Sequence, residues 1–351
     1  MKFIHIADVH LGADPNAGSA YGPLRRREIW TGLEKIVDLC RDEEIDLLLI
    51  VGDLFHRQPL LSELKEVNGL FSRLAKTQVV LCAGNHDYLK KDSYYRTFTW
   101  EKQVHMILGG GLEAVELPEI GTAVYGFSYE SKELTGKPYE GRKAKGLQPI
   151  EILMVHGGDE RHVPVKKEEI AELGYDYTAL GHIHKPQNLI PGKMAYCGAL
   201  EPVDKNDTGK HGYIYGEISD KNCRIKFVPS AVREYVHTSV RAAKGMSGSE
   251  LKEKIRKTIE EKGVQNIYKI TVTGFRSPDI LFDFQAMDTY GNIIEMVDDT
   301  KPFYDFEKIK RQNKGNILGG LIERLEGYGE DSLQYRAMCE GVKALMETRK
   351  D

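Results

Sequence analysis

The strongest constraint on the fold is a set of five short segments that place Asp, Asn or His directly after apolar, strand-like runs. These segments are Asp8-Val9-His10, Gly52-Asp53-Leu54-Phe55-His56, Gly84-Asn85-His86-Asp87, His156 and Gly181-His182-Ile183-His184. In open α/β sheets, ligand sites form beyond the carboxyl ends of the strands. The five strand ends therefore predict one site, built from carboxylate, amide and imidazole groups.

The apolar pattern around these segments predicts an α/β fold. The strand-like runs are residues 2–7, 47–51, 79–82, 152–155 and 177–180. Residues 47–51 form a continuous apolar run, which is typical of a strand buried on both faces. Apolar residues recur at helical spacing over 25–43 and again over 64–74, and Ser62 is placed to cap the second helix. The first 85 residues thus read as β-α-β-α-β.

The pattern changes near Arg233. An alternating segment at 235–240, a helix at 249–262 and a strand at 268–272 predict a small unit that covers the first domain as a lid. Residues 305–351 read as helical, with a last helix at 333–346. We expect a catalytic domain, a small α+β cap and a helical C-terminal segment at residues 1–230, 231–300 and 301–351.

Composition limits the function classes without choosing among them. The 351 residues are 41% hydrophobic and 29% charged, as in ordinary globular proteins. A net charge of −4 gives no overall basic footprint, so DNA binding would need local patches or a partner. The apolar runs are too short to span a membrane, and the N-terminus has no signal-peptide core, so we expect a cytoplasmic protein. The five cysteines are scattered, which argues against a disulfide framework or a zinc site.

The Asp, Asn and His residues are numerous enough to bind two metal ions. Two ions about 3.5–4 Å apart can generate a nucleophile and neutralise phosphoryl oxygens in phosphodiester hydrolysis. Asp53 is the natural shared carboxylate. One site would be completed by Asp8, His10 and His184, and the other by Asn85, His156 and His182. Oxygen and imidazole ligands without thiolates suit Mn²⁺, Fe or Zn, and we expect Mn²⁺.

Two histidines remain for substrate. We assign His86 as the general acid for the leaving oxygen and His56 to the scissile phosphate, with Asp87 orienting His86. Each motif alone has an ordinary reading: a lone histidine such as His156 is usually surface or core, and Gly-Asn-His-Asp can be a simple turn. Their joint occurrence in order, each after a strand, argues for the site. The ordinary reading is kept for His5, His105, His162, His211 and His237.

A mixture of basic and aromatic residues follows the third motif. It comprises Lys90, Lys91, Tyr94, Tyr95 and Arg96. Such a mixture can follow a nucleic-acid backbone and stack on an opened base. The aromatic residues could equally pack a loop, with the lysines solvated. We predict these residues as substrate contacts.

These motifs resemble those of the calcineurin-like metallophosphoesterase superfamily. Within it, the chain is most similar to the bacterial SbcD- and YhaO-type DNA repair nucleases, relatives of the eukaryotic meiotic-recombination double-strand-break nuclease. The similarity is sharpest over residues 1–215 and includes 180–186 and 196–202. His56 is the residue that best distinguishes these nucleases from the phosphoprotein phosphatases of the superfamily. The phosphatases carry Asp-Arg-Gly after Gly-Asp, whereas this chain has Phe55-His56.

The resemblance implies a four-layer α-β-β-α catalytic domain, a cap, and a C-terminal helical segment that docks an SMC-like ATPase of the SbcC or YhaN type. It implies manganese-dependent exonuclease action on double-stranded DNA and endonuclease action on single strands. Homodimers are common among such nucleases. The apolar stripe within 305–351 would serve equally well for ordinary core packing.

Two other functions remain open. A small-molecule or nucleotide phosphodiesterase could use the same metal site. A non-catalytic DNA-end scaffold could carry a vestigial site, although every expected ligand position holds a ligating residue type, which argues against degeneration.

Overall fold

The computed structural model describes residues 1–348 and divides the chain into two compact units, Met1–Tyr235 and Val236–Asp351. Hydrophobic clusters within the first unit contain no residue of the second, and the second unit has two clusters of its own. The division into 1–230, 231–300 and 301–351 stays a prediction.

The first unit contains two six-stranded sheets. The strands of the first sheet are β1 (Lys2–Ile6), β2 (Leu47–Val51), β3 (Gln78–Cys82), β4 (Val104–Ile107), β11 (Gly212–Ser219) and β12 (Asn222–Pro229). They are ordered β12-β11-β1-β2-β3-β4. β1 to β4 are parallel, and β11 adds antiparallel to β1. The strands expected near 2–7, 47–51 and 79–82 are therefore confirmed as neighbours in one sheet.

The second sheet consists of β5 (Glu113–Leu117), β6 (Thr122–Gly126), β7 (Ile150–His156), β8 (Tyr177–Gly181), β9 (Gln187–Ile190) and β10 (Met194–Tyr196). Its order is β5-β6-β7-β8-β10-β9. β6, β7, β8 and β10 run parallel, and the two edge strands pair antiparallel with their neighbours. β7 and β8 match the strands expected at 152–155 and 177–180.

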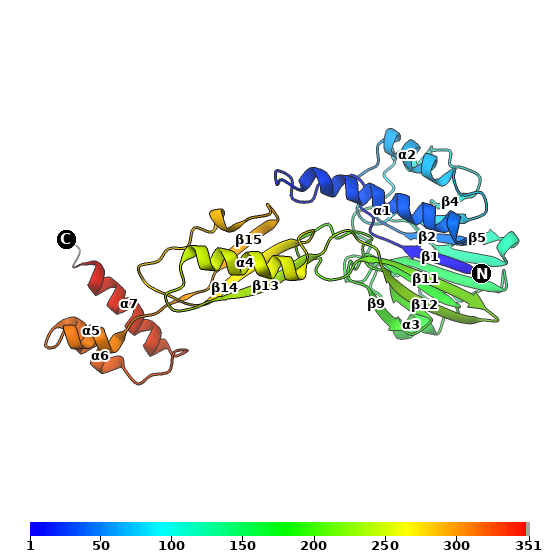
Figure 1. The fold of residues 1–351 in the computed structure, drawn as a ribbon. Helices are drawn as coiled ribbons and strands as arrows, with labels where there is room; N and C mark the ends of the chain where they lie inside the picture. The colour runs from blue at the N-terminus through cyan, green and yellow to red at the C-terminus, as the bar shows by residue number, and fades with distance from the viewer. Residues whose placement is uncertain (349–351) are drawn as a thin grey trace. The chain divides into compact units, whose positions relative to one another are not determined.

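Helices cover the outer faces of the two sheets. α1 (Gly22–Asp42) and α2 (Leu61–Phe71) lie on the first sheet, and the short α3 (Lys167–Ala171) lies on the far side of the second (Figure 1). Single 3-10 turns occur at Tyr94–Arg96 and Pro118–Ile120.

The first unit has four layers: helices, the first sheet, the second sheet and a helix. Three hydrophobic clusters lie between them. α1 and α2 pack on one face of β1 to β3, and the opposite face of those strands packs on the second sheet. Along β7, Ile152 and Met154 face the first sheet, whereas Leu153 and Val155 face the layer that contains α3. Strands buried on both faces explain the continuous apolar runs. The first unit is thus the expected α-β-β-α sandwich.

The start of α2 differs from the expectation. The helix begins at Leu61, so Ser62 lies inside the first turn and does not cap it. Instead, the Glu63 carboxylate accepts a hydrogen bond from the backbone N–H of Leu60 at 2.8 Å. An acidic side chain in the first turn thereby satisfies a helix-end N–H without a hydroxyl cap.

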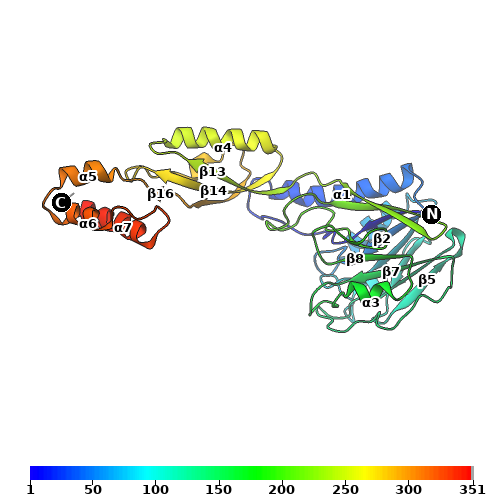
Figure 2. The same ribbon diagram turned by 90° about the horizontal axis from the view of Figure 1, so that it is seen from below.

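The second unit begins with a four-stranded sheet packed against one helix (Figure 2). Its elements are β13 (Tyr235–Ala242), α4 (Gly248–Lys262), β14 (Ile267–Arg276), β15 (Ile293–Asp298) and β16 (Lys301–Pro302), with a 3-10 turn at Gln285–Met287. Leu251, Ile255 and Ile259 on α4 pack on this sheet. A capping box between Ser247 and Glu250 starts α4.

Three helices end the described chain: α5 (Phe306–Gln312), α6 (Ile317–Leu325) and α7 (Leu333–Glu347). They enclose a separate small cluster that includes Leu318, Ile322 and Met338. The apolar stripe of α6 therefore packs partly as an ordinary core. Positions 349–351 of the helical segment predicted at 305–351 lie outside the described residues. Within residues 1–348, the helices are all too short or too polar to cross a membrane.

Candidate metal centre

The ends of five parallel strands deliver the predicted ligands. Asp8, Asp53 and Asn85 follow the adjacent strands β1, β2 and β3. His156 ends β7, and His182 follows its neighbour β8. The loops are joined by hydrogen bonds: the Asp8 backbone N–H donates to Gly52 O at 3.2 Å, and the His182 N–H donates to Asp8 Oδ2 at 2.9 Å. The two sheets thus contribute to one centre.

Backbone conformation turns the side chains inward. Four of the predicted ligands have left-handed φ angles: Asp8 (50°), His10 (54°), Asp53 (50°) and His182 (89°). Residues other than glycine avoid this region, and each such position costs on the order of 1–3 kcal/mol. Strain gathered at four residues of one cluster is typical of functional sites and is maintained by the surrounding structure.

The first group of ligands is Asp8, His10 and His184, each of which offers an atom within 4.8 Å of the others. His10 Nε2 lies 3.1 Å from His184 Nε2, and His184 Nε2 lies 4.0 Å from Asp8 Oδ1. Two imidazole nitrogens and a carboxylate oxygen therefore point at one small volume.

The second group combines Asn85, His156 and His182. Asn85 Oδ1 lies 3.0 Å from His156 Nε2 and 3.1 Å from His182 Nδ1. Asp53 lies between the groups, because its Oδ2 is 3.5 Å from His156 Nε2 and 4.0 Å from His10 Nε2. All seven predicted ligands are brought together, and Asp53 lies between the two groups. Its role as a shared ligand stays a prediction.

The chemistry of this cluster fits divalent cations. Asp8 Oδ1 is buried and has no hydrogen-bond partner among the described residues. Burial raises the pKa of the Asp8 carboxyl, although His156 and His184 oppose the shift. Burial also lowers the pKa of His10 well below its usual value, which favours the neutral, ligating imidazole. A buried carboxylate oxygen without a donor is costly, and a bound cation would remove that cost.

Glycines leave room for the ligand side chains. A Cβ on Gly84 would lie 2.2 Å from Asp53 Oδ1, and a Cβ on Gly52 would lie 2.3 Å from His156 Nδ1. Gly84 is thus required by the close approach of two loops of the first sheet, and Gly52 by the close approach of the first sheet to β7 of the second.

His56 and His86 lie beside the ligands. Their rings stack with centroids 4.9 Å apart, and the His86 ring is 4.8 Å from that of His10. The His86 backbone N–H donates to Asp53 Oδ1 at 2.9 Å, and its Nδ1 lies 3.0 Å from His56 O. Both residues line an open cavity of about 380 Å³, together with Asn85 and Lys90. Their assigned roles stay predictions.

Asp87 has a different position from the one expected. Its buried carboxylate accepts hydrogen bonds from the backbone N–H groups of Gly84 (2.8 Å) and Phe55 (3.2 Å) and from the Tyr95 hydroxyl (2.9 Å). Burial and the charge of Asp53 raise its pKa to about 7. Asp87 therefore holds two ligand-bearing loops together, and it does not orient the His86 ring.

The predicted DNA contacts are only partly retained. Lys90 lines the cavity beside His86, and Lys91 and Tyr94 are exposed. Tyr95 is 1% exposed and packs in the core beneath the loop, so it cannot stack on a base. Arg96 donates to Leu89 O and pairs with Glu130 at 3.0 Å. A run of basic and aromatic residues does not indicate which of its side chains are buried. Packing against the rest of the unit determines this.

Three residues of the site were missed by sequence reasoning. Asp159 Oδ2 lies 3.0 Å from His182 Nε2 and 3.0 Å from His162 Nδ1, and Asp207 Oδ2 lies 3.0 Å from His184 Nδ1. His162, which was expected to be an ordinary surface histidine, lines the cavity. These residues follow no motif, and only tertiary contacts reveal them.

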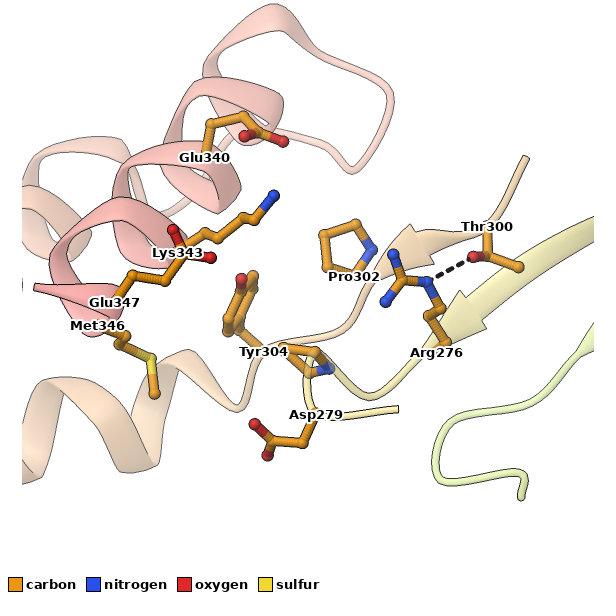
Figure 3. Close-up of a pocket in the computed structure, with 10 residues that line it drawn as sticks. Arg276, Asp279, Thr300, Pro302, Tyr304, Glu340, Lys343, Met346 and Glu347 are labelled. Atoms are coloured by element: carbon orange, nitrogen blue, oxygen red, sulfur yellow. Dashed lines mark hydrogen bonds between the residues drawn. The ribbon is translucent and has the colours of Figure 1, made fainter. Parts of the chain in front are cut away.

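The second unit has a cavity of its own, of about 260 Å³ (Figure 3). Arg276 and Lys343 face it from β14 and α7, and the Arg276 Nε donates to Thr300 Oγ1 at 3.0 Å. The cavity mixes these cations with Asp279, Glu340 and Glu347, and none of the predicted site residues lines it.

Comparison with known proteins identifies the family. The sequence profile of the calcineurin-like phosphoesterases matches residues 1–186, which is more than half of the chain. The chain is 28% identical over 247 residues to the uncharacterized metallophosphoesterase YhaO of Bacillus subtilis, covering 65% of this chain and 60% of YhaO. It is 27% identical over 271 residues to the DNA double-strand break repair protein Mre11 of Methanocaldococcus jannaschii, covering 70% and 71%.

Among solved structures, the chain is similar to TT1561 of Thermus thermophilus, with 11% identity, a TM-score of 0.36 and coverage of 64% of this chain and 98% of that one. It is also similar to GAP50 of Plasmodium, with 13% identity, a TM-score of 0.38 and coverage of 65% and 84%. The chain belongs to the calcineurin-like phosphoesterase family, whose members use a dinuclear metal site.

Proposed function

We propose that this calcineurin-like phosphoesterase is a metal-dependent DNA repair nuclease that hydrolyses phosphodiester bonds. The observation that carries the proposal is the gathering of seven Asp, Asn and His side chains beside the stacked His56 and His86. Asn85, His56 and His86 line an open cavity. The M. jannaschii relative bears the name of a DNA double-strand break repair protein, which supports DNA as the substrate.

Asp8, His10 and His184 would hold one divalent ion, Asn85, His156 and His182 the other, and Asp53 both. Mn²⁺ is the expected ion, with Fe or Zn as alternatives, because the ligands are oxygen and imidazole without thiolate. Bound divalent ions at such a centre supply Lewis acidity and lower the pKa of water.

The remaining groups act on substrate. His86 faces the cavity and is close enough to His10 to reach a phosphate held at the ligands, so we assign it proton donation to the leaving oxygen. His56 stacks on His86 and would contact the scissile phosphate. Lys90 and Lys132 add positive charge at the cavity wall, which suits an anionic backbone.

Partners follow from the same proposal. We expect an SMC-like ATPase of the SbcC or YhaN type to dock on the C-terminal helices, where Ile317 and Leu333 are 78% and 73% exposed. Exposed apolar side chains on helices suit a helical partner. Double-stranded exonuclease and single-stranded endonuclease activity, and homodimer formation, are part of this proposal.

The test is a Mn²⁺-dependent cleavage assay on end-labelled double-stranded and single-stranded DNA. Wild type, His86→Ala and a matched control, His105→Gln, are compared, with an aryl phosphodiester as a second substrate. His105 pairs with Gln78 on the first sheet and does not line the cavity. We expect DNA cleavage by wild type and the control, abolition by a chelator, and loss in His86→Ala.

Turnover of the aryl phosphodiester without DNA cleavage, even after an SMC-like ATPase is added, would favour the small-molecule or nucleotide phosphodiesterase. Protein that binds no metal and cleaves neither substrate would favour the DNA-end scaffold. Cleavage by the full chain that is lost on removal of residues 231–351, with aryl phosphodiester turnover kept, would support the nuclease.

A further inference from the structure

The two histidines of Gly181-His182-Ile183-His184 each turn one ring nitrogen toward the predicted ligands and the other toward a carboxylate. His184 turns Nε2 toward the ligand cluster, 3.1 Å from His10 Nε2, and its Nδ1 lies 3.0 Å from Asp207 Oδ2. His182 turns Nδ1 toward the cluster, 3.1 Å from Asn85 Oδ1, and its Nε2 lies 3.0 Å from Asp159 Oδ2. Each ring thus lies between the centre and a carboxylate from another segment of the chain.

We propose that Asp207 and Asp159 are positioning residues, each of which fixes the orientation and tautomer of one metal-ligating histidine, one carboxylate for each ion. This inference rests on the dinuclear centre of the proposed function. A histidine that donates one N–H to a carboxylate presents the lone pair of its other nitrogen, and the carboxylate increases the basicity of that nitrogen. The two rings use opposite nitrogens, which the positions of the two carboxylates explain.

Asp207 is held by the backbone of its own loop. Its Oδ2 accepts hydrogen bonds from the backbone N–H groups of Val203 and Asp204, both at 2.9 Å. The side chain is only 12% exposed. Because Asp207 cannot easily follow a displaced ring, its hydrogen bond restricts His184 to one orientation.

Asp159 is less firmly held. Its Oδ1 accepts from the backbone N–H groups of Arg161 (2.8 Å) and His162 (3.0 Å), but its carboxylate is shared between His182 and His162 and is 50% exposed. Solvent and a second imidazole therefore compete for it. We expect a smaller effect from losing the charge of Asp159 than from losing that of Asp207.

The experiment measures metal binding by the full chain, independently of catalysis. Metal-free wild type, Asp207→Asn and Asp159→Asn are titrated with Mn²⁺, and the bound metal is followed by elemental analysis and electron paramagnetic resonance. The matched controls are Asp204→Asn and Glu160→Gln, which change exposed acidic neighbours in the same two loops. Manganese anomalous scattering from crystals locates the ion that is lost.

We expect two ions in wild type and both controls. Each Asp→Asn variant should bind one of the two ions about 10–100-fold more weakly, as for other carboxylates that support a ligand histidine. The signal of a coupled manganese pair should give way to that of an isolated ion at intermediate metal. The weakened ion should be the one beside His184 in Asp207→Asn and the one beside His182 in Asp159→Asn.

Several results would overturn the proposal. Unchanged affinity for both ions in the variants would show that the carboxylates do not position the rings, and loss of the same ion in both would refute the one-to-one assignment. A third ion in wild type that disappears in Asp159→Asn would make Asp159 a ligand, since Asp159, His162 and His182 could themselves hold a cation. A wild type that binds no Mn²⁺, Fe or Zn would instead refute the metal centre and the proposed function.

Thermal unfolding of the metal-free variants separates metal effects from misfolding. If Asp207→Asn unfolds early because the Val203–Asp204 turn is weakened, Asp207→Glu replaces it, since Glu keeps the charge but moves the carboxylate. Weaker binding of the ion beside His184 in a folded Asp207→Glu supports the proposal, and wild-type binding of both ions contradicts it.

Discussion

At the residue scale, the centre combines unfavourable backbone angles with buried polar atoms. Asp8, His10, Asp53 and His182 have left-handed φ angles, and Asp8 Oδ1 has no donor among the described residues. The φ angles cost free energy that the surrounding structure must supply. The unpartnered Asp8 oxygen also costs free energy, and a bound cation would remove that second cost. The stability of this unit is therefore expected to depend on metal.

Asp53 is the ligand whose loss should be felt most. Its carboxylate lies between the two ligand groups, 3.5 Å from His156 Nε2 and 4.0 Å from His10 Nε2. Asp53→Ala should therefore release at least one of two ions after dialysis, as measured by elemental analysis. Asp14→Ala, an exposed aspartate, is the control. Retention of both ions by Asp53→Ala would rule out the shared position.

His86 should affect turnover without affecting metal content. Its Nδ1 faces the His56 carbonyl oxygen, and it lines the cavity. A ring nitrogen of His86 also lies within 4.8 Å of ring nitrogens of His10 and His56, so metal content has to be measured together with turnover. We expect His86→Ala to keep both ions and to lose roughly 10²–10⁴ in kcat, the range for a general acid. Single-turnover rates and elemental analysis of the same preparation check this, and loss of an ion would identify His86 as a ligand.

His5 should make the first unit less stable in acid. It is fully buried on β1 beside the Tyr177 hydroxyl (2.9 Å), and burial lowers its pKa to about 3. Between that value and its usual 6.5, the unfolded chain binds a proton that the native state does not. Stability is therefore complete above pH 6.5 and falls as the pH decreases toward 3.

Urea unfolding of wild type and His5→Gln at pH 6.5 and 4.5 measures this contribution. The wild type should lose on the order of 2–3 kcal/mol more than the variant over this range. Both tryptophans, Trp30 and Trp100, lie in the first unit, so their fluorescence follows its unfolding alone. An equal pH dependence in the two proteins would show that His5 protonates in the folded state.

At the element scale, a buried ion pair joins α1 to the rest of the first unit. Arg25 is fully buried; it donates to Pro202 O at 2.7 Å and pairs with Glu201 at 3.2 Å. Burial raises the pKa of Glu201, although Arg25 opposes the shift. The N-terminal half of α1 is thus tied to the segment that follows β10, near the loop that carries Asp207.

Removing Arg25 should leave the Glu201 carboxylate buried without its cationic partner, although the Val232 backbone N–H still donates to it at 2.8 Å. We expect Arg25→Ala to destabilise the first unit by roughly 3–5 kcal/mol, the usual cost of breaking a buried pair. Arg27→Ala, an exposed arginine on the same helix, should change stability little. Tryptophan fluorescence in urea measures both, and equal stabilities would show that the pair contributes no net free energy.

At the scale of the whole molecule, the two units have separate cores. The clusters that hold the two sheets of the first unit end at Ile225, and the clusters of the second begin at Val236. All seven predicted ligands and both histidines assigned to substrate lie in the first unit. The metal centre should therefore form without the second unit.

A fragment of residues 1–235 tests this expectation. It should unfold cooperatively in urea, with the midpoint and slope that tryptophan fluorescence reports for the full chain, and should bind two ions. A non-cooperative transition, or loss of metal binding by a folded fragment, would show that the second unit is needed to complete the first.

Much of the architecture could be predicted from local patterns. Local sequence predicted the strands at 47–51 and 177–180 and the helix at 25–43. A continuous apolar run indicates a strand buried on both faces, and apolar residues at helical spacing indicate a helix. The edge strands β5, β9 and β12 were not predicted, since half-exposed strands have weak apolar patterns.

The sequence by itself determined which Asp, Asn and His residues gather at one place, because residues that follow strand ends meet where parallel strands end together. Only the tertiary structure decided that Asp87 joins two loops, that Tyr95 is core, and that Asp159 and Asp207 hold the outer nitrogens of His182 and His184. These outcomes depend on which loops meet and which side chains turn inward. Such contacts join residues far apart in the chain, so no local pattern contains them.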